Sequence, residues 1–296
     1  MKKNSIFKGA GTALVTPLNE NGIDYENFGR LIDWQIACGI DALVICGTSG
    51  EGSTLSDEEH RAALKFAVDR AAGKVPMIAG TGSNDTAYAI DLTKFAGEIG
   101  YDGALLVTPY YNKATQNGLI KMFTAIADNS TIPCILYNVP SRTGVNIEPA
   151  TYAALAEHPM ITAVKEANGN ISKIVETFSL VGDKLDIYSG NDDQIVPLLS
   201  MGGSGVISVL SNLMPKETSL MCKKFFEGNV KEAAKMQMDY LPLINALFCE
   251  VNPIPVKAAM SAMGYGENYV RLPLTPMEKP HEEILLGLMR EQGLIK

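Results

Sequence analysis

The residue whose type and position most strongly indicate chemistry is Lys165, which ends an apolar run. The segment "ITAVKEA" (161–167) is apolar from Ile161 to Val164 and then places an ammonium group where another apolar residue is expected. Burial disfavours the charged form of a lysine and so raises the fraction of neutral amine. Because only the neutral amine adds to a ketone or aldehyde, the pattern indicates a Schiff-base nucleophile. The alternative is a structural lysine that extends to solvent or pairs with Glu166.

A tyrosine at the equivalent position of the preceding apolar run supports the nucleophile. Tyr137 lies near the end of "PCILYNVP" (133–140), one repeat before Lys165. Neighbouring strands of a sheet are about 5 Å apart, so the phenol is expected to reach the amine or an intermediate bound to it. A phenol in that place can carry protons to and from the reacting atoms.

Two further segments offer groups that bind anions. "GTSGEGSTLS" (47–56) presents backbone N–H groups with the hydroxyls of Thr48 and Ser49, which suit a carboxylate or phosphate, although an ordinary turn with a glycine at positive φ has the same composition. Arg142 in "YNVPSRTG" (137–144) is either a solvated surface cation or a fork-shaped clamp for a carboxylate. The clamp would imply an anionic second substrate.

The sequence lacks the motifs that several other kinds of active site or binding site require. The glycine-rich turn has no Gly-Lys-Ser/Thr ending and no G-x-S-x-G, and none of the three histidines ends an apolar run. Serine hydrolysis and a His-rich metal site are therefore disfavoured. H-E-x-x-H and paired C-x-x-C motifs are absent, and "GTG" (80–82) and "GGSG" (202–205) lack the dinucleotide-binding pattern. We expect neither a metal nor a cofactor.

The composition of the chain limits the classes of binding partner and the cellular compartment that we expect. A net charge of -8 over 296 residues, with no long basic run, disfavours nucleic acids and anionic membranes but allows small acidic substrates. Five scattered cysteines, an odd number, fit a reducing compartment better than a disulfide framework. No apolar stretch approaches the length of a membrane-spanning helix. We therefore expect a cytoplasmic protein.

The elements that must position these residues repeat along the chain. Eight short apolar runs, bounded by Gly, Pro, Asn or Asp, alternate with segments of helical spacing, which is typical of parallel strands covered on both faces. The runs are 11–17, 41–47, 76–82, 103–111, 133–140, 161–167, 186–192 and 205–212. Eight βα units predict an α/β fold, a (β/α)8 TIM barrel whose active site lies at the carboxyl ends of the strands. A doubly wound open sheet is the alternative.

After residue 214 the strand patterns stop. Segments 215–228, 230–250, 252–264 and 280–293 have helical spacing. We therefore expect a catalytic barrel over residues 1–214 and a C-terminal helical region over 215–296, packed on the barrel without a flexible linker. Among the barrel helices, Ser56 is the expected N-cap of one, with Glu59 completing a capping box.

Seven motifs together resemble one family. They are "GTSGE", "VTPYYNK", "YNVPSRTG", "AVKEA", "YSGNDD", "GVISVLSN" and "NPIPVK". In this order they are similar to the dihydrodipicolinate synthase family, within the pyruvate-dependent class I aldolases that also include N-acetylneuraminate lyase. The resemblance covers nearly the whole chain, including the helical region.

The resemblance implies a role for each matching residue. Lys165 would form the Schiff base with pyruvate, and Tyr137 would relay protons to it. Thr48 would connect Tyr137 with Tyr111, which in the family reaches across a dimer interface. The remaining matches concern binding: Thr48 and Ser49 for the pyruvate carboxylate, Arg142 for the carboxylate of aspartate semialdehyde, and Gly190 and Ile207 as lining of the pocket. The reaction implied is the condensation of these two substrates without a cofactor.

The resemblance also concerns regulation and assembly. Family members inhibited by lysine carry a histidine and a glutamate in an effector pocket where this chain has Asp57 and Tyr88. The other positions of that pocket are Ser53, His60, Asn84 and Tyr110. We therefore expect weak or absent feedback by lysine. The family assembly is a homotetramer, a dimer of dimers.

Two other functions remain open at this stage. A sister aldolase would use the same Lys165 and Tyr137 to split a sugar acid such as N-acetylneuraminate, but it has less use for a cation at Arg142. A catalytically silent member would bind a keto acid as a sensor, which the presence of all the chemical groups argues against.

Overall fold

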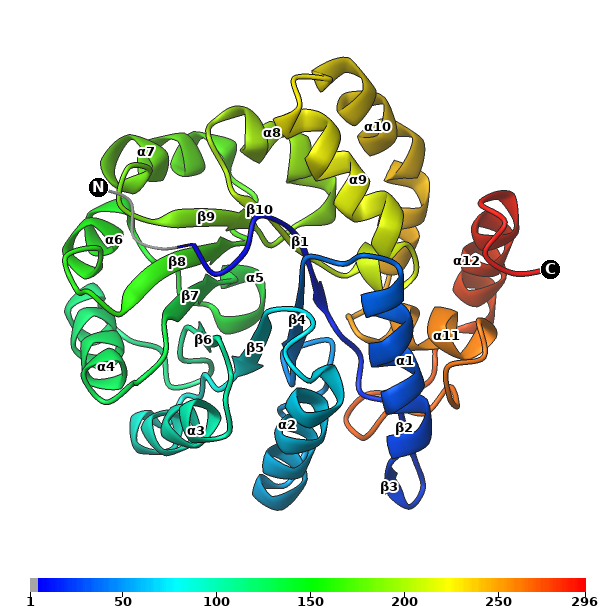
Figure 1. Ribbon diagram of the computed structural model, residues 1–296, viewed down its shortest axis with the longest axis horizontal. Helices are drawn as coiled ribbons and strands as arrows, with labels where there is room; N and C mark the ends of the chain where they lie inside the picture. The colour runs from blue at the N-terminus through cyan, green and yellow to red at the C-terminus, as the bar shows by residue number, and fades with distance from the viewer. Residues whose placement is uncertain (1–4) are drawn as a thin grey trace. The chain divides into compact units, whose positions relative to one another are not determined.

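The computed structural model describes residues 5–296, and its longer strands form a closed barrel (Figure 1). The spatial order of these strands is β1-β10-β9-β8-β7-β6-β5-β4, as expected for a parallel (β/α)8 barrel. Their bounds are β1 (Gly9–Ala13), β4 (Ala42–Ile45), β5 (Met77–Gly80), β6 (Gly103–Val107), β7 (Cys134–Asn138), β8 (Ile161–Glu166), β9 (Asp186–Ser189) and β10 (Gly205–Ser208). The predicted barrel is confirmed, and the doubly wound open sheet is wrong.

The barrel strands are buried along their whole length, except for the half-buried Val107 at the end of β6. All six residues of β8 and all five of β7 are buried, including the polar ones. Strands covered on both faces lack the alternation of half-exposed strands, which is why they read as continuous apolar runs in the sequence. A short antiparallel hairpin, β2 (Leu18–Asn19) and β3 (Gly22–Ile23), was not predicted because two-residue strands leave no apolar pattern.

Helices connect the strands and form the C-terminal region. Their bounds are α1 (Tyr25–Ala37), α2 (Asp57–Ala71), α3 (Thr86–Glu98), α4 (Gln116–Asp128), α5 (Pro140–Thr143), α6 (Pro149–Leu155), α7 (Ile171–Val181), α8 (Ile195–Ser200), α9 (Pro215–Phe226), α10 (Val230–Leu247), α11 (Ile254–Ala262) and α12 (Lys279–Glu291), with 3-10 turns η1 (Asp192–Gln194) and η2 (Leu210–Asn212). The predicted capping box of α2 is present: Ser56 Oγ accepts from the backbone N of Glu59 at 3.2 Å, and the Glu59 carboxylate accepts from the backbone N of Ser56 at 2.9 Å.

The chain divides into two compact units. Unit 1 comprises residues 5–9 and 76–207 and contains the strands β5 to β9 and most of β10. Within it, each strand from β5 to β10 pairs in parallel with the next. Helices α4, α6 and α7 lie outside strands β6 to β9 (Figure 1). This unit holds the two strands whose ends carry Tyr137 and Lys165.

Unit 2 comprises residues 10–75 and 208–296, so the C-terminal helices belong with β4 and most of β1. A buried amide joins them: Asn212 in η2 donates to the carbonyl of Ala13 at 2.9 Å and accepts from the backbone N of Val15 at 3.0 Å. The predicted boundary at residue 214 falls directly before α9. Nowhere in residues 5–296 is a helix both long and apolar enough to span a membrane.

Candidate active site

Tyr137 and Lys165 lie opposite each other at the ends of β7 and β8. The register of the two parallel strands pairs them directly, and Lys165 Nζ is 4.3 Å from the centroid of the Tyr137 ring. Lys165 is 5% exposed and Tyr137 is 6% exposed. The amine therefore does not extend into solvent and lies beside the aromatic face of the tyrosine. The pairing that the sequence predicted brings an amine and a phenol within reach of one bound molecule.

The end of β9 is shaped to leave room for the lysine stem. A Cβ atom added at Gly190 would lie 2.7 Å from Ala167 Cβ and 3.2 Å from Lys165 Cγ. The backbone N of Gly190 also donates to the carbonyl of Glu166 at 2.7 Å. Only a residue without a side chain fits this close approach. Ile207, the other residue expected to line the pocket, is fully buried in β10.

The opposite face of the same two strand ends carries a buried polar network. Successive residues of a strand point to opposite faces, so Asn138 and Glu166 lie behind Tyr137 and Lys165. Asn138 Nδ2 donates to Glu166 Oε1 at 3.0 Å, and Tyr152 OH donates to Glu166 Oε2 at 2.8 Å. The sequence left open that Lys165 pairs with Glu166. The structure argues against this pairing, because the Glu166 carboxylate accepts hydrogen bonds from Asn138 and Tyr152 on the opposite face of the strand.

Burial dominates the titration of this carboxyl group. It raises the pKa of Glu166 to about 7, although hydrogen bonds from Tyr152, the backbone of Asn168 and Asn138 act in the opposite direction. Burial also raises the pKa of Tyr152 well above its usual value, and the Glu166 charge adds to this effect. Behind the ends of β7 and β8, the structure thus holds a carboxyl group whose pKa is raised to about 7.

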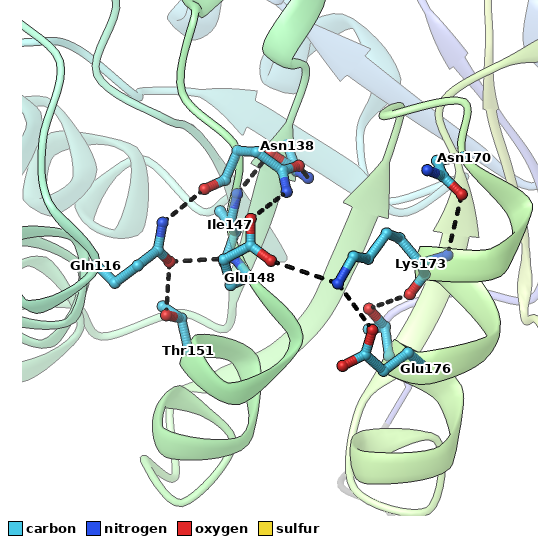
Figure 2. A network of polar contacts seen from close by, with 10 residues as sticks. Gln116, Asn138, Ile147, Glu148, Thr151, Asn170, Lys173 and Glu176 are labelled. Atoms are coloured by element: carbon cyan, nitrogen blue, oxygen red, sulfur yellow. Dashed lines mark hydrogen bonds and ion pairs between the residues drawn. The ribbon is translucent and has the colours of Figure 1, made fainter.

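The loop after β7, which contains Arg142, is held in place on its C-terminal side (Figure 2). Asn138 Oδ1 accepts from the backbone N of Ile147 at 3.1 Å. Gln116 of α4 accepts from the backbone N of Glu148 at 3.1 Å and from Thr151 Oγ1 at 2.6 Å. Arg142 itself is exposed on the short helix α5. The loop that carries this guanidinium is therefore anchored by backbone and side-chain hydrogen bonds.

The loop after β6 displays Tyr111 in an unusual conformation. Its φ is 69°, in the left-handed region that few residues other than glycine adopt, and its side chain is 94% exposed. The carbonyl of the neighbouring Tyr110 accepts from Asn84 Nδ2 at 3.1 Å and from the backbone N of Asn112 at 2.9 Å. The loop is therefore held by a hydrogen bond of its own backbone and by one from the loop after β5, while it presents an aromatic ring outward.

In unit 2 the segment after β4 forms a tight turn around Thr48 and Ser49. The backbone N of Gly50 donates to the carbonyl of Gly47 at 3.1 Å, and that of Glu51 to the carbonyl of Thr48 at 3.2 Å. Ser49 is buried, and its hydroxyl accepts from Asn252 Nδ2 at 3.1 Å. The two hydroxyls proposed for anion binding are thus adjacent, and one of them is anchored from the C-terminal region.

The glycines of this turn serve close packing rather than positive φ. The left-handed residues are Cys46 at φ 56° and Glu51 at φ 52°, neither of them glycine. A Cβ at Gly50 would lie 3.1 Å from the Cys46 backbone, and one at Gly52 only 2.3 Å from the Cys46 carbonyl oxygen. The alternative that the sequence left open, an ordinary turn with a glycine at positive φ, does not describe this segment.

The residues that match the family's effector pocket are divided between the two units. Ser53, Asp57 and His60 belong to unit 2, whereas Asn84, Tyr88 and Tyr110 belong to unit 1. Asp57 begins α2 and forms an ion pair with Arg61 at 2.9 Å. His60 is buried in the same helix. The acid at residue 57 is thus engaged by a cation of its own helix.

Within residues 5–296 no group of three or more His, Cys, Asp and Glu side chains could hold a metal ion. None of the five cysteines forms a disulfide, and Cys46, Cys134 and Cys222 are buried. Burial raises the pKa of the Cys134 thiol to about 11, as expected for an unreactive thiol.

Sequence reasoning missed the residues that support the candidate site. Asn138 and Glu166 directly follow the two residues it selected, so the alternation of a strand could have assigned them to the opposite face. Glu51 and Lys257 form a buried ion pair although they are 206 positions apart. Lys257 lies in the "NPIPVK" motif, but nothing local in the sequence connects it with the turn after β4.

A (β/α)8 barrel with a buried lysine at one strand end, and a tyrosine beside it, defines the class of enzymes that form Schiff bases with carbonyl substrates. The comparison with known families is specific within that class. The chain belongs to the dihydrodipicolinate synthetase family, whose sequence model matches residues 6–291. A 4-hydroxy-tetrahydrodipicolinate synthase from Acetivibrio thermocellus is 52% identical over 293 residues, covering 99% of this chain and 100% of the relative.

Solved structures agree in fold over nearly the whole chain. The dihydrodipicolinate synthase from Thermotoga maritima has a TM-score of 0.96 at 41% identity, covering 98% of this chain and 100% of that one. A chloride-inhibited dihydrodipicolinate synthase from Acinetobacter baumannii, complexed with pyruvate, has a TM-score of 0.95 at 42% identity, covering 97% of this chain and 99% of that one.

Proposed function

We propose that the chain is a 4-hydroxy-tetrahydrodipicolinate synthase, which condenses pyruvate with L-aspartate 4-semialdehyde on the route to diaminopimelate and lysine. The observation that carries the proposal is the buried amine of Lys165, 4.3 Å from the ring centroid of Tyr137 at the ends of β8 and β7. The names of the relatives, and the pyruvate bound to one solved member of the family, support it.

The reaction begins with the neutral amine of Lys165. It adds to the keto carbon of pyruvate and loses water, and the protonated imine that forms withdraws electrons from the methyl group. Loss of a methyl proton gives an enamine, whose carbon attacks the aldehyde carbon of the semialdehyde. The aldehyde oxygen takes up a proton and becomes a hydroxyl, and the imine to Lys165 forms again. The amino group of that substrate then attacks the imine carbon and expels Lys165 as the ring closes. The imine itself is the electron sink, so the mechanism uses no cofactor.

The other residues bind substrates or transfer protons in this proposal. Tyr137 moves protons to and from the imine, and Thr48 and Tyr111 extend the proton path. Thr48 and Ser49 hold the pyruvate carboxylate, and Arg142 binds the carboxylate of the semialdehyde with its planar fork. Gly190 and Ile207 shape the pocket around the lysine.

The proposed assembly is a homotetramer built as a dimer of dimers. The fixed and 94% exposed ring of Tyr111 supports an interface with a second copy, because a large exposed aromatic side chain is typical of an interaction site. The proposed compartment is the cytoplasm, which five free cysteines support.

The proposal is tested by comparing two substrates and one substitution. The protein is expected to consume pyruvate and aspartate semialdehyde, and not to cleave N-acetylneuraminate. Arg142→Gln removes the charge and is expected to raise the KM for the semialdehyde about 10-fold or more, with the KM for pyruvate within about twofold. The exposed Arg290→Gln in α12 is the matched control.

Three outcomes would contradict the proposal. Faster cleavage of the sugar acid than condensation would identify the sister aldolase. A pyruvate adduct without turnover of either substrate would identify a sensor. An unchanged KM for the semialdehyde in the Arg142 variant would show that Arg142 does not bind the carboxylate of that substrate.

A further inference from the structure

A buried ion pair connects the turn after β4 with the C-terminal region. The side chains of Glu51 and Lys257 are 1% and 2% exposed, and their charged ends are in direct contact. Glu51 belongs to the same turn as Thr48 and Ser49, and Lys257 belongs to α11. All of these residues lie in unit 2. A contact between positions 206 residues apart fixes the turn to a distant segment of the chain.

The other oxygen of the Glu51 carboxylate extends this connection. Glu51 Oε2 accepts from the backbone N of Arg271 at 3.1 Å and lies 3.4 Å from Thr54 Oγ1. The Arg271 guanidinium donates to the carbonyl of Thr54 at 3.0 Å and to both carboxylate oxygens of Glu59, at 2.6 and 2.5 Å. Burial lowers the pKa of the Lys257 amine, against the opposing charge of Glu51. The segment from Glu51 to Thr54 is thus held by the charged side chains of Lys257 and Arg271.

Stability alone does not account for this arrangement. Taking a carboxylate and an ammonium out of water costs several kcal/mol per ion, and apolar residues of similar volume often stabilise a fold as well or better. The φ of 52° at Glu51 adds about 1 kcal/mol or more of backbone strain, which persists only where the surroundings fix the conformation. What the pair provides in return is a defined position for the turn.

We propose that Glu51 and Lys257 are positioning residues that set the hydroxyl and N–H groups of Thr48 and Ser49 for the carboxylate of pyruvate. Asn252 acts in the same way through its 3.1 Å hydrogen bond to Ser49 Oγ. The C-terminal helical region thereby governs the affinity for pyruvate rather than for the second substrate. This inference rests on the function proposed above.

The test measures pyruvate binding without the second substrate. Each variant is incubated with increasing concentrations of pyruvate, and the imine on Lys165 is reduced with borohydride. Mass spectrometry gives the fraction of protein that carries the adduct, and the pyruvate concentration at half of the maximal fraction is compared between variants. Glu51→Gln and Lys257→Met are expected to raise this concentration about 10-fold or more, because small displacements of binding groups have large effects. The control is Lys235→Met, which removes an exposed ion pair with Asp239 in α10 and is expected to change it less than about twofold.

A double variant separates positioning from a purely structural role. Lys257→Met alone leaves a buried carboxylate without its counter-ion, whereas Glu51→Gln with Lys257→Met leaves no buried charge. The double variant is therefore expected to recover the thermal stability of the wild type while its affinity for pyruvate stays low. Its preference for pyruvate over the uncharged pyruvamide is also expected to fall, because the carboxylate is no longer recognised.

The outcomes distinguish this inference from the function on which it rests. If Glu51→Gln and the double variant bind pyruvate within twofold of the wild type, the positioning role is wrong and the proposed function stands. If affinity and stability recover together in the double variant, the pair is structural and the inference is again wrong. If the wild type forms no adduct, the proposed function fails and the inference fails with it.

Discussion

Gly190 packs directly against the aliphatic part of the Lys165 side chain, where a larger residue would not fit. A side chain at residue 190 would begin 3.2 Å from Lys165 Cγ and 2.7 Å from Ala167 Cβ, both closer than ordinary packing allows. The glycine at the end of β9 therefore determines where the lysine at the end of β8 can lie. The position of the Lys165 side chain depends on a neighbouring strand as well as on its own.

Gly190→Ala is expected to impair catalysis more than stability. The added methyl group displaces Lys165 from its place beside Tyr137, which is expected to lower kcat/KM about 10- to 100-fold. Overpacking of this kind costs about 1–3 kcal/mol of folding free energy. Steady-state kinetics and thermal unfolding measure the two effects. Gly287→Ala in α12, where an added Cβ meets nothing within 4 Å, is the control, and equal kinetics in the two variants would contradict the argument.

Tyr137→Phe separates the two contributions of that ring. The phenylalanine keeps an aromatic face beside the amine, but it removes the hydroxyl to which the proposed mechanism assigns proton transfer. Loss of a general acid–base group typically costs about 10²- to 10⁴-fold, so kcat is expected to fall within this range while the protein remains folded. Stopped assays of product formation measure it. Tyr25→Phe, on the exposed surface of α1, is the control, and a Tyr137 variant as active as this control would exclude proton relay by the phenol.

The Glu166 network gives the protein a distinctive dependence of stability on pH. Burial raises the pKa of Glu166 from 4.5 to about 7, so between these values the folded state retains a proton that the unfolded chain has released. The favourable contribution is complete below the unfolded pKa and is lost as the pH rises through the folded pKa. The free energy of unfolding should therefore decrease by about 3 kcal/mol from this group across that window.

Glu166→Gln tests the assignment because an amide does not titrate. Chemical denaturation of the wild type and the variant from pH 4 to pH 8 gives the difference between their unfolding free energies. That difference is expected to change in favour of the variant as the pH rises, mainly between about 5 and 7. A difference independent of pH would mean that Glu166 has no raised pKa. Glu20→Gln, exposed in the turn after β2, is the control.

Feedback by L-lysine is expected to be weak. By the resemblance, Asp57 stands where inhibited family members carry a histidine, and Tyr88 stands where they carry a glutamate. In the structure Asp57 is paired with Arg61. Millimolar lysine should therefore leave most of the activity intact, since it would bind with a Kd of about 1 mM or weaker. The double substitution Asp57→His with Tyr88→Glu is expected to increase inhibition. A micromolar inhibition constant for the wild type would overturn the prediction.

The barrel was predictable because its strands are buried on both faces. Seven of the eight apolar runs contain a whole strand of the barrel, and the eighth, 11–17, overlaps β1, which begins two residues earlier at Gly9. The runs differ from the helices in length and in their content of branched residues. The hairpin of β2 and β3 was not predictable, because two-residue strands have no period to detect. The helices α5 and α6 were also missed, since both are short and begin at prolines that equally indicate a loop.

The candidate site was predictable where its residues interrupt a pattern. Lys165 breaks an apolar strand, and Tyr137 occupies the matching position one repeat earlier, so strand register alone brings them together. The support behind them was not predictable. Which donor meets Glu166, or which cation meets Glu51, depends on the packing of segments up to 206 residues apart, and no local pattern encodes that distance.

The covalent role of Lys165 is the central claim, and trapping the adduct tests it most directly. The protein is incubated with pyruvate and borohydride, digested, and the modified peptide is located by mass spectrometry, with Lys165→Arg and the exposed Lys173→Arg as paired variants. The account predicts a reduced pyruvate adduct on Lys165 in the wild type and in the Lys173 variant, and none in the Lys165 variant. An adduct elsewhere, or no adduct in the wild type, would contradict it.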